Sequence, residues 1–452
     1  MVVTGGTPPD GVRRRPLAVS TVLTYATSLA AAVFSLGNVL VVSRALGPDG
    51  RGDIALLTTI SFIVSSVALL GVEESMQNIA GREPERRPAL ATNALVLATI
   101  FGSVGGAIVA GATLAYPDVA GQVPRRLVWL ALAVLPMLVF LAYLQYLTLA
   151  DYAFGLTNLT WLIPSFTNVT INGALDAAGQ LTIGRAFAAW IVGQAVATVL
   201  AVWYVLRRGA GFGRPDAGLA RRSIGFGVKS HAGRLMTLGN YRLDQWLVGS
   251  IAGSGALGLY SVAVAWSEGL FFLPNVLSLV QRADLVRASP EEAARQAARA
   301  FRGALLLTGI LAAAVVLAAP VLCVTVFGSE FRGSVNELRI LAPGALGMVA
   351  LKQLANALIA QRRPLRATAG ISVAFALTLV LDLALIPGRG GLGASIASTV
   401  AYCVGGAAVA ILFARALGLR LGELAPGPAD GFDLLHTARS LVRRVRADAE
   451  PA

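Results

Sequence analysis

Charged residues are scarce in this 452-residue chain, and so are cysteine, histidine and lysine. Only 13% of its residues are charged, against roughly 25% in soluble domains. The two cysteines, Cys323 and Cys403, both lie in apolar runs, which argues against a disulfide framework or a cysteine metal site. The chain has two histidines and no glycine-rich loop followed by Lys-Ser/Thr. We therefore expect no catalytic residues, no metal site and no direct use of ATP.

Apolar sequence is abundant instead, with 56% hydrophobic residues and a mean hydropathy of +0.70. About twelve apolar runs reach the roughly 20 residues that a helix needs to cross a hydrocarbon core. The runs fall near 19–43, 54–77, 89–115, 127–149, 153–173, 181–206, 225–251, 256–281, 303–327, 336–360, 364–386 and 391–416. No loop exceeds about 22 residues. The sequence therefore predicts an all-α polytopic membrane protein without a soluble catalytic domain.

The net charge of +13 follows membrane topology and is not typical of nucleic-acid binding. With a cytoplasmic N-terminus, 25 of the 37 Lys and Arg residues fall in cytoplasmic segments and eight in outside loops. This excess is the positive-inside bias. We therefore predict a multi-pass protein of the plasma (inner, cytoplasmic) membrane, with both termini cytoplasmic and with anionic lipids, not nucleic acid, as partners. The basic patch at 13–15 resembles a signal peptide, but the apolar run after it is too long for one.

Short matches about half a chain apart indicate an internal duplication. They are Leu36–Asn38 with Leu238–Asn240, and Gly47 and Gly52 with Gly253 and Gly258. Two parallel repeats of six spans each would give two six-helix bundles, a 6+6 pseudo-repeat.

The predicted organisation has five parts. They are a cytoplasmic N-terminal segment at 1–18, a six-helix bundle at 19–206, a cytoplasmic linker at 207–224, a second six-helix bundle at 225–416 and a cytoplasmic basic tail at 417–452. Apolar and arginine residues alternate at helical spacing between Phe432 and Val445. That pattern predicts an amphipathic helix on the anionic leaflet, with a disordered tail as the alternative.

The seventh span, 225–251, carries more charge than a membrane helix tolerates without a partner or a wet cavity. It contains Lys229, His231, Arg234 and Arg242, and the chain's other lysine, Lys352, lies in another apolar run. A helical wheel places His231, Arg234 and Arg242 on one face with Gln245, and Lys229 on another. Cations at this depth are candidates for binding an anionic substrate such as a phosphate. The alternative is that the long side chains extend to the two membrane surfaces.

Carboxylates inside the spans are candidates for cation coupling. Asp244 lies in the seventh span, Glu268 in the eighth and Asp382 in the eleventh. A carboxylate in a low-dielectric site can exchange protons near neutral pH. The alternative for each is a static counter-ion to a nearby arginine.

Amide side chains line one face of the fifth span. Asn158 and Asn168 share this face with Ser165 and Asn172. The stripe is suited to hydrogen bonds with sugar hydroxyls, although such residues more often hold helices together.

Three local motifs resemble those of bacterial polysaccharide flippases of the multidrug/oligosaccharidyl-lipid/polysaccharide (MOP) exporter superfamily. Ser43–Gly52 (SRALGPDGRG) is similar to the loop after the first span, and Gly258–Ala263 (GLYSVA) is similar to the entry to the eighth. Leu385–Pro387 followed by Gly391–Ala397 resembles the junction of spans eleven and twelve. The motifs occur in order over nearly the whole chain.

The resemblance implies two six-helix bundles around a central cavity that works by alternating access. It implies outward transport of undecaprenyl-diphosphate-linked glycans for cell-surface polysaccharide, with cavity cations holding the diphosphate. H⁺, Na⁺ or the membrane potential would drive transport without a bound cofactor, and other polysaccharide-assembly membrane proteins are candidate partners. Asp382 departs from the pattern, because relatives tend to have Asn there.

Three other functions fit the sequence less well. A cation-coupled multidrug antiporter of the same superfamily predicts an acidic cavity, whereas the charges here are mostly basic. A membrane-embedded glycan polymerase or ligase would need a long outside loop, which the chain lacks. A structural partner without transport activity would not explain the charged seventh span.

Overall fold

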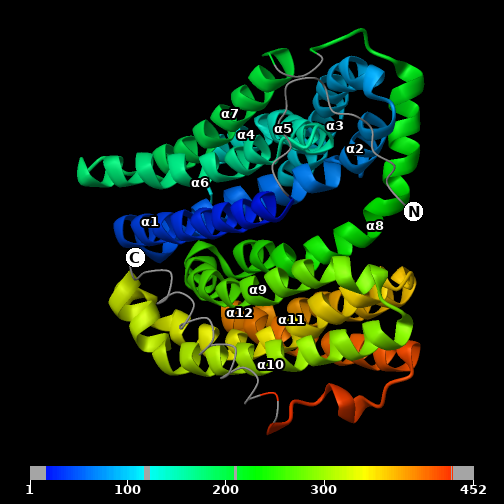
Figure 1. Cartoon of the computed structure of the whole chain (residues 1–452). Helices are drawn as coiled ribbons and strands as arrows, with labels where there is room; N and C mark the ends of the chain where they lie inside the picture. Colours follow the sequence, from blue (N-terminus) through cyan, green and yellow to red (C-terminus); the bar gives the residue numbers. More distant parts are fainter. Residues whose placement is uncertain (1–16, 117–122, 208–210, 429, 431–452) are drawn as a thin grey trace, which may run out of the picture. The chain divides into compact units, whose positions relative to one another are not determined.

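A computed structural model describes residues 17–116, 123–207, 211–428 and 430, and within these residues the regular structure is entirely helical (Figure 1). The α-helices are α1 Leu17–Ala68, α2 Val72–Arg82, α3 Arg87–Ala115, α4 Arg125–Ala133, α5 Leu135–Ala150, α6 Phe154–Ala177, α7 Ile183–Arg207, α8 Ala217–Leu247, α9 Ser254–Arg287, α10 Pro290–Pro320, α11 Ser334–Ala360 and α12 Pro364–Leu417. Short turns of other helix types join some of them. They are η1 Pro84–Arg86, η3 Val248–Ala252, η4 Val321–Thr325, η5 Ser329–Gly333 and η6 Leu421–Leu424.

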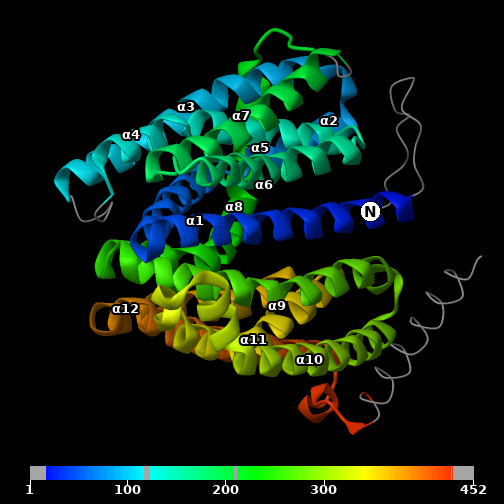
Figure 2. The same ribbon diagram turned by 90° about the vertical axis from the view of Figure 1, so that its left-hand side faces the viewer.

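Among the described residues, seven helical stretches are long and apolar enough to cross a membrane. Two of these, in α1 and α12, bend at a glycine, Gly47 and Gly390, so each supplies two crossing segments. Figure 2 shows the two arms of α1 meeting at a sharp bend. The more polar helices α6, α8 and α9 complete the twelve predicted segments. The prediction of an all-α polytopic protein with about twelve transmembrane helices is confirmed.

The chain divides into two compact units, 1–261 and 262–452. In the first unit, α1 packs against α6, α6 against α7, and α8 against α1 and α2. In the second unit, α11 packs against both α10 and α12. Helix α8, which the sequence places at the start of the second half, thus belongs to the first unit by its contacts. The five-part division with a linker at 207–224 stays a prediction.

Two glycines matched by the sequence repeat have the same unusual backbone. Gly47 has φ 66° and ψ −173°, and Gly253 has φ 88° and ψ 173°. These dihedrals are open to glycine and costly for other residues. Each glycine ends one transmembrane segment and is followed at once by the next helix. The pseudo-repeat predicted from sequence is therefore visible in the backbone.

The residues beside these two glycines contact each other reciprocally. A Cβ added to Gly52 would overlap the carbonyl oxygen of Ser254, and a Cβ added to Gly258 would overlap that of Pro48. Pro48 begins the helix after the first bend, and Ser254 begins the helix after the second. Gly52 of the first repeat therefore contacts the helix start of the second repeat, and Gly258 of the second repeat contacts the helix start of the first. Such an exchange of equivalent contacts is the signature of a two-fold relation.

The stretch Ser43–Gly52, expected to form a loop, is helical on both sides of Gly47. Pro48 takes the first position of the second arm, where its missing N–H is no loss and its fixed φ suits a helix. The first turn of that arm therefore includes Arg51. The expectation of a loop was wrong, because Gly47 alone reverses the direction of the chain and no longer connecting segment is needed.

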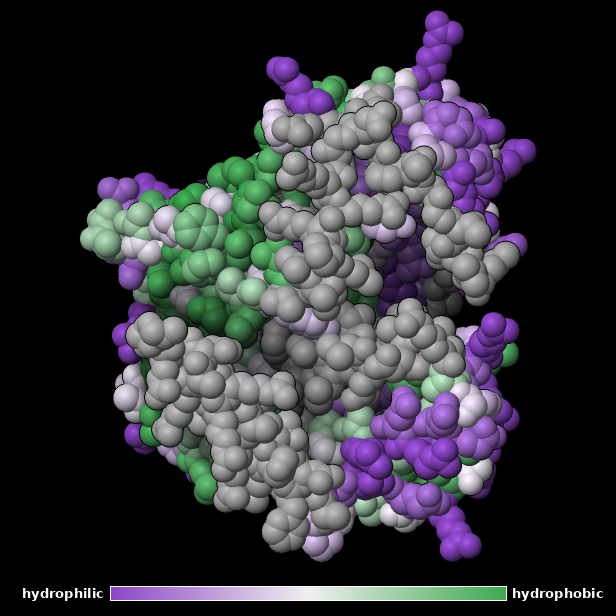
Figure 3. Space-filling model, in the orientation of Figure 1, coloured by the Kyte–Doolittle hydropathy of each residue, from purple (hydrophilic) through white to green (hydrophobic). Residues whose placement is uncertain are grey.

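Helix surfaces in the first unit follow the bilayer pattern. Figure 3 shows hydrophobic side chains over the middle of these helices and hydrophilic ones toward their ends. Beneath that surface, a core cluster joins α2, α3 and α5, including Met76, Leu90, Tyr143 and Leu144, all fully buried. The predicted amphipathic helix at Phe432–Val445 lies outside the described residues.

Candidate functional site

The start of α8, the charged seventh segment, is fixed to α3 and to the end of α2. Asp216 caps α8, its Oδ1 accepting the Leu219 N–H at 2.9 Å, and Asn93 bonds both backbone groups of Asp216. Glu83 bridges Arg86 at 2.7 Å and Arg222 at 2.6 Å. The hydrogen bond from Arg222, with the charges of both arginines, lowers the pKa of Glu83 below its ordinary value. These contacts set where α8 enters the bundle.

Helix α8 then crosses a break between α1 and α2 at very close range. Leu70 and Gly71 have φ of 50° and 71°, which interrupts the second transmembrane segment. A Cβ on Gly71 would overlap the Gly227 carbonyl, and a Cβ on Gly227 would lie 2.5 Å from the Gly71 carbonyl carbon. Two glycines thus allow α8 to pass against the bare backbone of the break.

Side chains bond two carbonyls beside this break, in addition to the backbone N–H groups that these carbonyls accept. The Val67 oxygen lies 3.2 Å from His231 Nε2, and the Leu69 oxygen accepts the Tyr143 hydroxyl at 3.1 Å. Because a carbonyl can only accept, Nε2 carries the hydrogen. Nδ1 of His231 is buried without a partner among the described residues. His231 therefore holds the interrupted helix, and its proposed contact with substrate stays a prediction.

Arg234, one turn further along α8, lies in a pocket of opposite charge. Its Nη1 donates to Glu73 and to the Tyr146 hydroxyl at 3.2 Å, and Glu74 lies 3.9 Å away. The guanidinium also stacks over the Tyr146 ring at 5.8 Å. Glu73 is fully buried, whereas the Arg234 side chain is 37% exposed. The positive charge that the sequence offered to a substrate is thus already balanced by a buried carboxylate.

Arg242 lies further along the same face of α8 and interacts electrostatically with Arg51, which was not among the predicted site residues. Its guanidinium stands over the Phe62 ring at 5.9 Å, and its charge repels that of Arg51 on α1. Arg51 is half-buried, and its Nε lacks a partner among the described residues. The topology count assigned Arg51 to an outside loop. Pro48, three residues before Arg51, was the signal in the sequence that a helix restarts there, because proline favours the first helical position.

The predicted wheel face of α8 points at the second transmembrane segment. His231 meets Val67, Arg242 meets Phe62, and Gln245 accepts a hydrogen bond from Thr59 at 3.4 Å. Asp244 faces elsewhere, is buried and accepts the Tyr260 hydroxyl at 2.5 Å. Lys229 is exposed. The helical wheel therefore correctly placed the exposed Lys229 on a different face of α8 from the residues that pack on α1 and α2.

The remaining candidates belong to the second unit. Lys352 on α11 is half-buried and is attracted by the charge of Glu268 on α9. Asp382 on α12 is fully buried. Within the described residues, no three His, Cys, Asp or Glu side chains come together in a way that could hold a metal ion.

The amide stripe of α6 is bonded to α1. Asn158 donates to Thr24 Oγ1 at 3.0 Å, and Asn172 donates to Asn38 Oδ1 at 2.7 Å and to Asn168 Oδ1 at 2.9 Å. These two interhelical pairs each have a sequence separation of 134 residues, and Ser165 of the stripe also bonds Ser35 on α1 at 3.0 Å, with a separation of 130. Because these separations agree to within about one helical turn, α1 and α6 run parallel for about 20 Å.

We expect a double-mutant cycle on Asn38 and Asn172 to report this bond. Replacing each by Leu, singly and together, should give a coupling free energy of about 0.6 kcal/mol and up to about 1.7 kcal/mol, the range for interhelical hydrogen bonds in membranes. Unfolding in mixed micelles measures it. Strictly additive single substitutions would show that the bond contributes nothing to helix association.

No protein-family model matches the sequence, and no curated protein matches it either. Three solved structures show the fold. The lipid II flippase MurJ, in an inward closed conformation, aligns with a TM-score of 0.69 at 12% identity, covering 89% of each chain. An inward-facing multidrug resistance MATE family transporter gives 0.68 at 12% identity, over 88% of this chain and 98% of that one.

The third is a MOP superfamily transporter from Pyrococcus furiosus, described as having a binding pocket of reverse polarity. It aligns at 0.59 and 12% identity over 88% of this chain and 95% of that one. MurJ and the MATE transporters are both MOP members, the superfamily that the three loop motifs resemble. The chain therefore has the twelve-helix, pseudo-symmetric fold of MOP-superfamily transporters.

Proposed function

We propose that the chain is a transporter and not an enzyme, and that it moves an anionic polyprenyl-diphosphate-linked oligosaccharide across the bacterial plasma membrane by alternating access. The transported glycan would serve cell-surface polysaccharide synthesis. A flippase and drug transporters share this fold, so the fold does not distinguish their substrate classes. We therefore infer the substrate class from the charges of the site. Both termini would be cytoplasmic.

The observation that carries the proposal is the buried Nε of Arg51, unpartnered within the described part of the chain, together with the repulsion between the charges of Arg51 and Arg242. Two like charges inside an apolar unit repel each other with little screening, and such an arrangement costs free energy unless an anion offsets it. Arg51 Nε is buried and without a partner among the described residues, so it retains a donor for a ligand. A diphosphate offers several acceptor oxygens to two guanidinium groups through charge-assisted hydrogen bonds.

The other predicted residues take subsidiary roles in this proposal. Arg234 balances Glu73 and reaches an exposed region with part of its side chain, so it would guide the approach of the diphosphate. His231 continues the basic face toward the start of α8, whereas Lys229 lies exposed on another face and takes no part in binding. Lys352, in the second unit, is a further candidate cation. Asn158 and Asn168 would contact sugar with amide atoms that α1 does not occupy. Asp244, Glu268 and Asp382 are the candidates for coupling to H⁺ or Na⁺.

A cation-coupled multidrug antiporter is the second candidate. The multidrug MATE transporters among the similar structures favour it, as does the acidic pair Glu73 and Glu74 on α2. Because Glu73 is already bound to Arg234, its charge is less available to an organic cation. The diphosphate-linked glycan is therefore the better-supported substrate.

A binding measurement tests the proposal. The full chain in detergent is titrated with a fluorescent short-chain polyprenyl-diphosphate oligosaccharide. We expect Arg51→Gln and Arg242→Gln each to weaken binding about tenfold, because a hydrogen bond to a charged group contributes about 1.5 kcal/mol or more. The exposed residue Lys229 provides the control variant Lys229→Gln, which should bind within about twofold of the wild type. Unchanged binding in both arginine variants would refute the assignment, and competition by an organic cation but not by pyrophosphate would favour the antiporter.

A further inference from the structure

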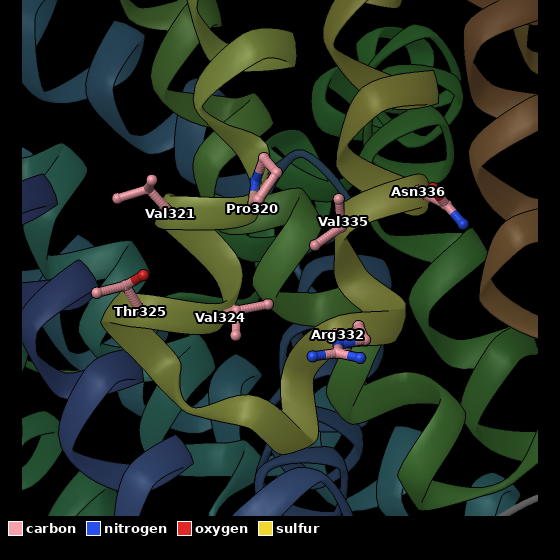
Figure 4. A pocket seen from close by; sticks show the side chains of 7 residues that line it. All are labelled: Pro320, Val321, Val324, Thr325, Arg332, Val335 and Asn336. Atoms are coloured by element: carbon pink, nitrogen blue, oxygen red, sulfur yellow. The ribbon is translucent and has the colours of Figure 1, made fainter.

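The second unit contains a cavity lined by residues that the proposed function does not use. Where α10 ends, η4 and η5 turn the chain into α11 around an open cavity of about 400 Å³. The cavity is lined by Pro320, Val321, Val324, Thr325, Arg332, Val335 and Asn336. Figure 4 shows the valines as its walls and the Arg332 guanidinium at one edge. The cavity is thus apolar with a cationic rim.

The rim continues as a short basic stripe. Arg332, Asn336 and Arg339 follow one another at four- and three-residue intervals, and all three are exposed. Arg339 Nε is oriented by the Val316 carbonyl on α10, at 3.4 Å. Within the described residues, the Arg332 side chain makes no hydrogen bond or ion pair. A guanidinium with all its donors unused is a ready site for an oxyanion.

An apolar stripe on α10, continued by the first residue of η4, runs up to this rim. Ile310, Leu317 and Val321 recur at seven- and four-residue intervals and expose 63%, 80% and 57% of their surface. Such large aliphatic side chains on a membrane-crossing helix belong in contact with acyl chains. The stripe and the rim together match the two ends of one phospholipid molecule.

Nearby carboxylates do not cancel the rim charge. Glu337 is 6% exposed and lies on the buried side of α11 with Val335 and Leu338, whereas Asn336 and Arg339 point outward. Glu330, two residues before Arg332 in η5, is exposed and forms no ion pair with it within the described residues. The accessible rim is therefore positive and offers the Asn336 amide as a further donor.

We propose that this cavity binds the phosphate headgroup of an anionic phospholipid, with Arg332 and Arg339 on the phosphate and the acyl chains along the α10 stripe. By the predicted topology the lipid would lie in the outer leaflet. Charge complementarity and the adjoining apolar stripe favour a whole lipid over a free anion, which has no use for that stripe. The site is independent of the transported substrate.

Native mass spectrometry of the full chain tests the proposal. The protein in detergent receives equal amounts of dioleoyl phosphatidylglycerol and dioleoyl phosphatidylcholine, and the retained lipids are counted. We expect preferential retention of phosphatidylglycerol, weakened about fivefold at one site by Arg332→Gln, because a juxtamembrane arginine contributes about 1 kcal/mol to anionic-lipid binding. Leu317→Ser should also weaken retention without changing the charge. The control is Arg389→Gln, which removes an exposed arginine at the α12 bend of the same unit and should leave retention unchanged.

Three results would overturn the proposal. They are equal retention of the two lipids by the wild type, wild-type retention by Arg332→Gln, and an equal loss in Arg389→Gln. Added inorganic phosphate separates the two sources of the anion. If millimolar phosphate displaces the retained lipid from the wild type and Leu317→Ser has no effect, the cavity is a site for the free ion and the lipid assignment fails.

Discussion

Gly52→Ala is expected to leave little folded protein in detergent. The added Cβ would overlap the carbonyl oxygen of Ser254, which is a backbone atom and cannot rotate away. Overpacking of a buried site costs about 1–3 kcal/mol, and a rigid backbone neighbour places this contact at or above the upper end. Because Gly258 makes the equivalent contact with Pro48, Gly258→Ala should cause a similar loss. Size-exclusion recovery and unfolding in mixed micelles measure both.

Gly173→Ala provides the matched control. Gly173 lies within α6, and a Cβ there would meet nothing within 4 Å. In a helix interior, alanine is favoured over glycine by about 0.5–1 kcal/mol, so this variant should be as stable as the wild type or more stable. If Gly52→Ala and Gly173→Ala gave equal yields and equal unfolding free energies, the reciprocal contact would not hold the two repeats together.

Arg234→Ala is expected to lower the free energy of unfolding by about 3 kcal/mol. The substitution leaves Glu73 fully buried with no cation beside it, and removing one partner of a buried ion pair costs about 3–5 kcal/mol. The partial exposure of Arg234 places the expected cost at the lower end. Lys229→Ala, which removes an exposed cation from the same helix, should change stability by no more than about 0.5 kcal/mol.

The partner substitution separates charge from packing. In the double variant Glu73→Gln/Arg234→Gln no charge remains buried, so most of the lost stability should return. If the double variant were as unstable as Arg234→Ala, the loss would come from packing against Tyr146 and not from the unpaired carboxylate. If Arg234→Ala unfolded like the wild type, Glu73 would not depend on Arg234 in the folded protein.

The sequence predicted the elements that depend on composition. Apolar length specified the twelve membrane segments, and the matched glycines predicted a repeat whose backbone is visible at Gly47 and Gly253. Helical periodicity also placed His231 and Arg242 on one face of α8. These features depend on residues that are close together in the sequence, so a single sequence is enough to predict them.

What the sequence missed depends on contacts between distant segments. The break at Leu70 and Gly71 has no strong local signal, because a single glycine in an apolar run is compatible with an unbroken helix. Arg234 pairs with Glu73, which lies 161 positions away in the sequence. Because that pairing could not be seen in the sequence, the positive charge available in α8 was overestimated. Arg51 was assigned to a loop, and its proximity to Arg242 appears only in the folded unit.

Transport itself is the most direct measure of the central claim, that Arg51 and Arg242 receive the diphosphate of a lipid-linked glycan. Proteoliposomes containing the full chain and a fluorescent polyprenyl-diphosphate oligosaccharide report translocation by chemical quenching of the exposed leaflet. We predict translocation by the wild type and by Lys229→Gln, and rates about tenfold lower in Arg51→Gln and in Arg242→Gln. Wild-type rates in both arginine variants, or export of an organic cation by a wild type that leaves the diphosphate lipid in place, would contradict the account.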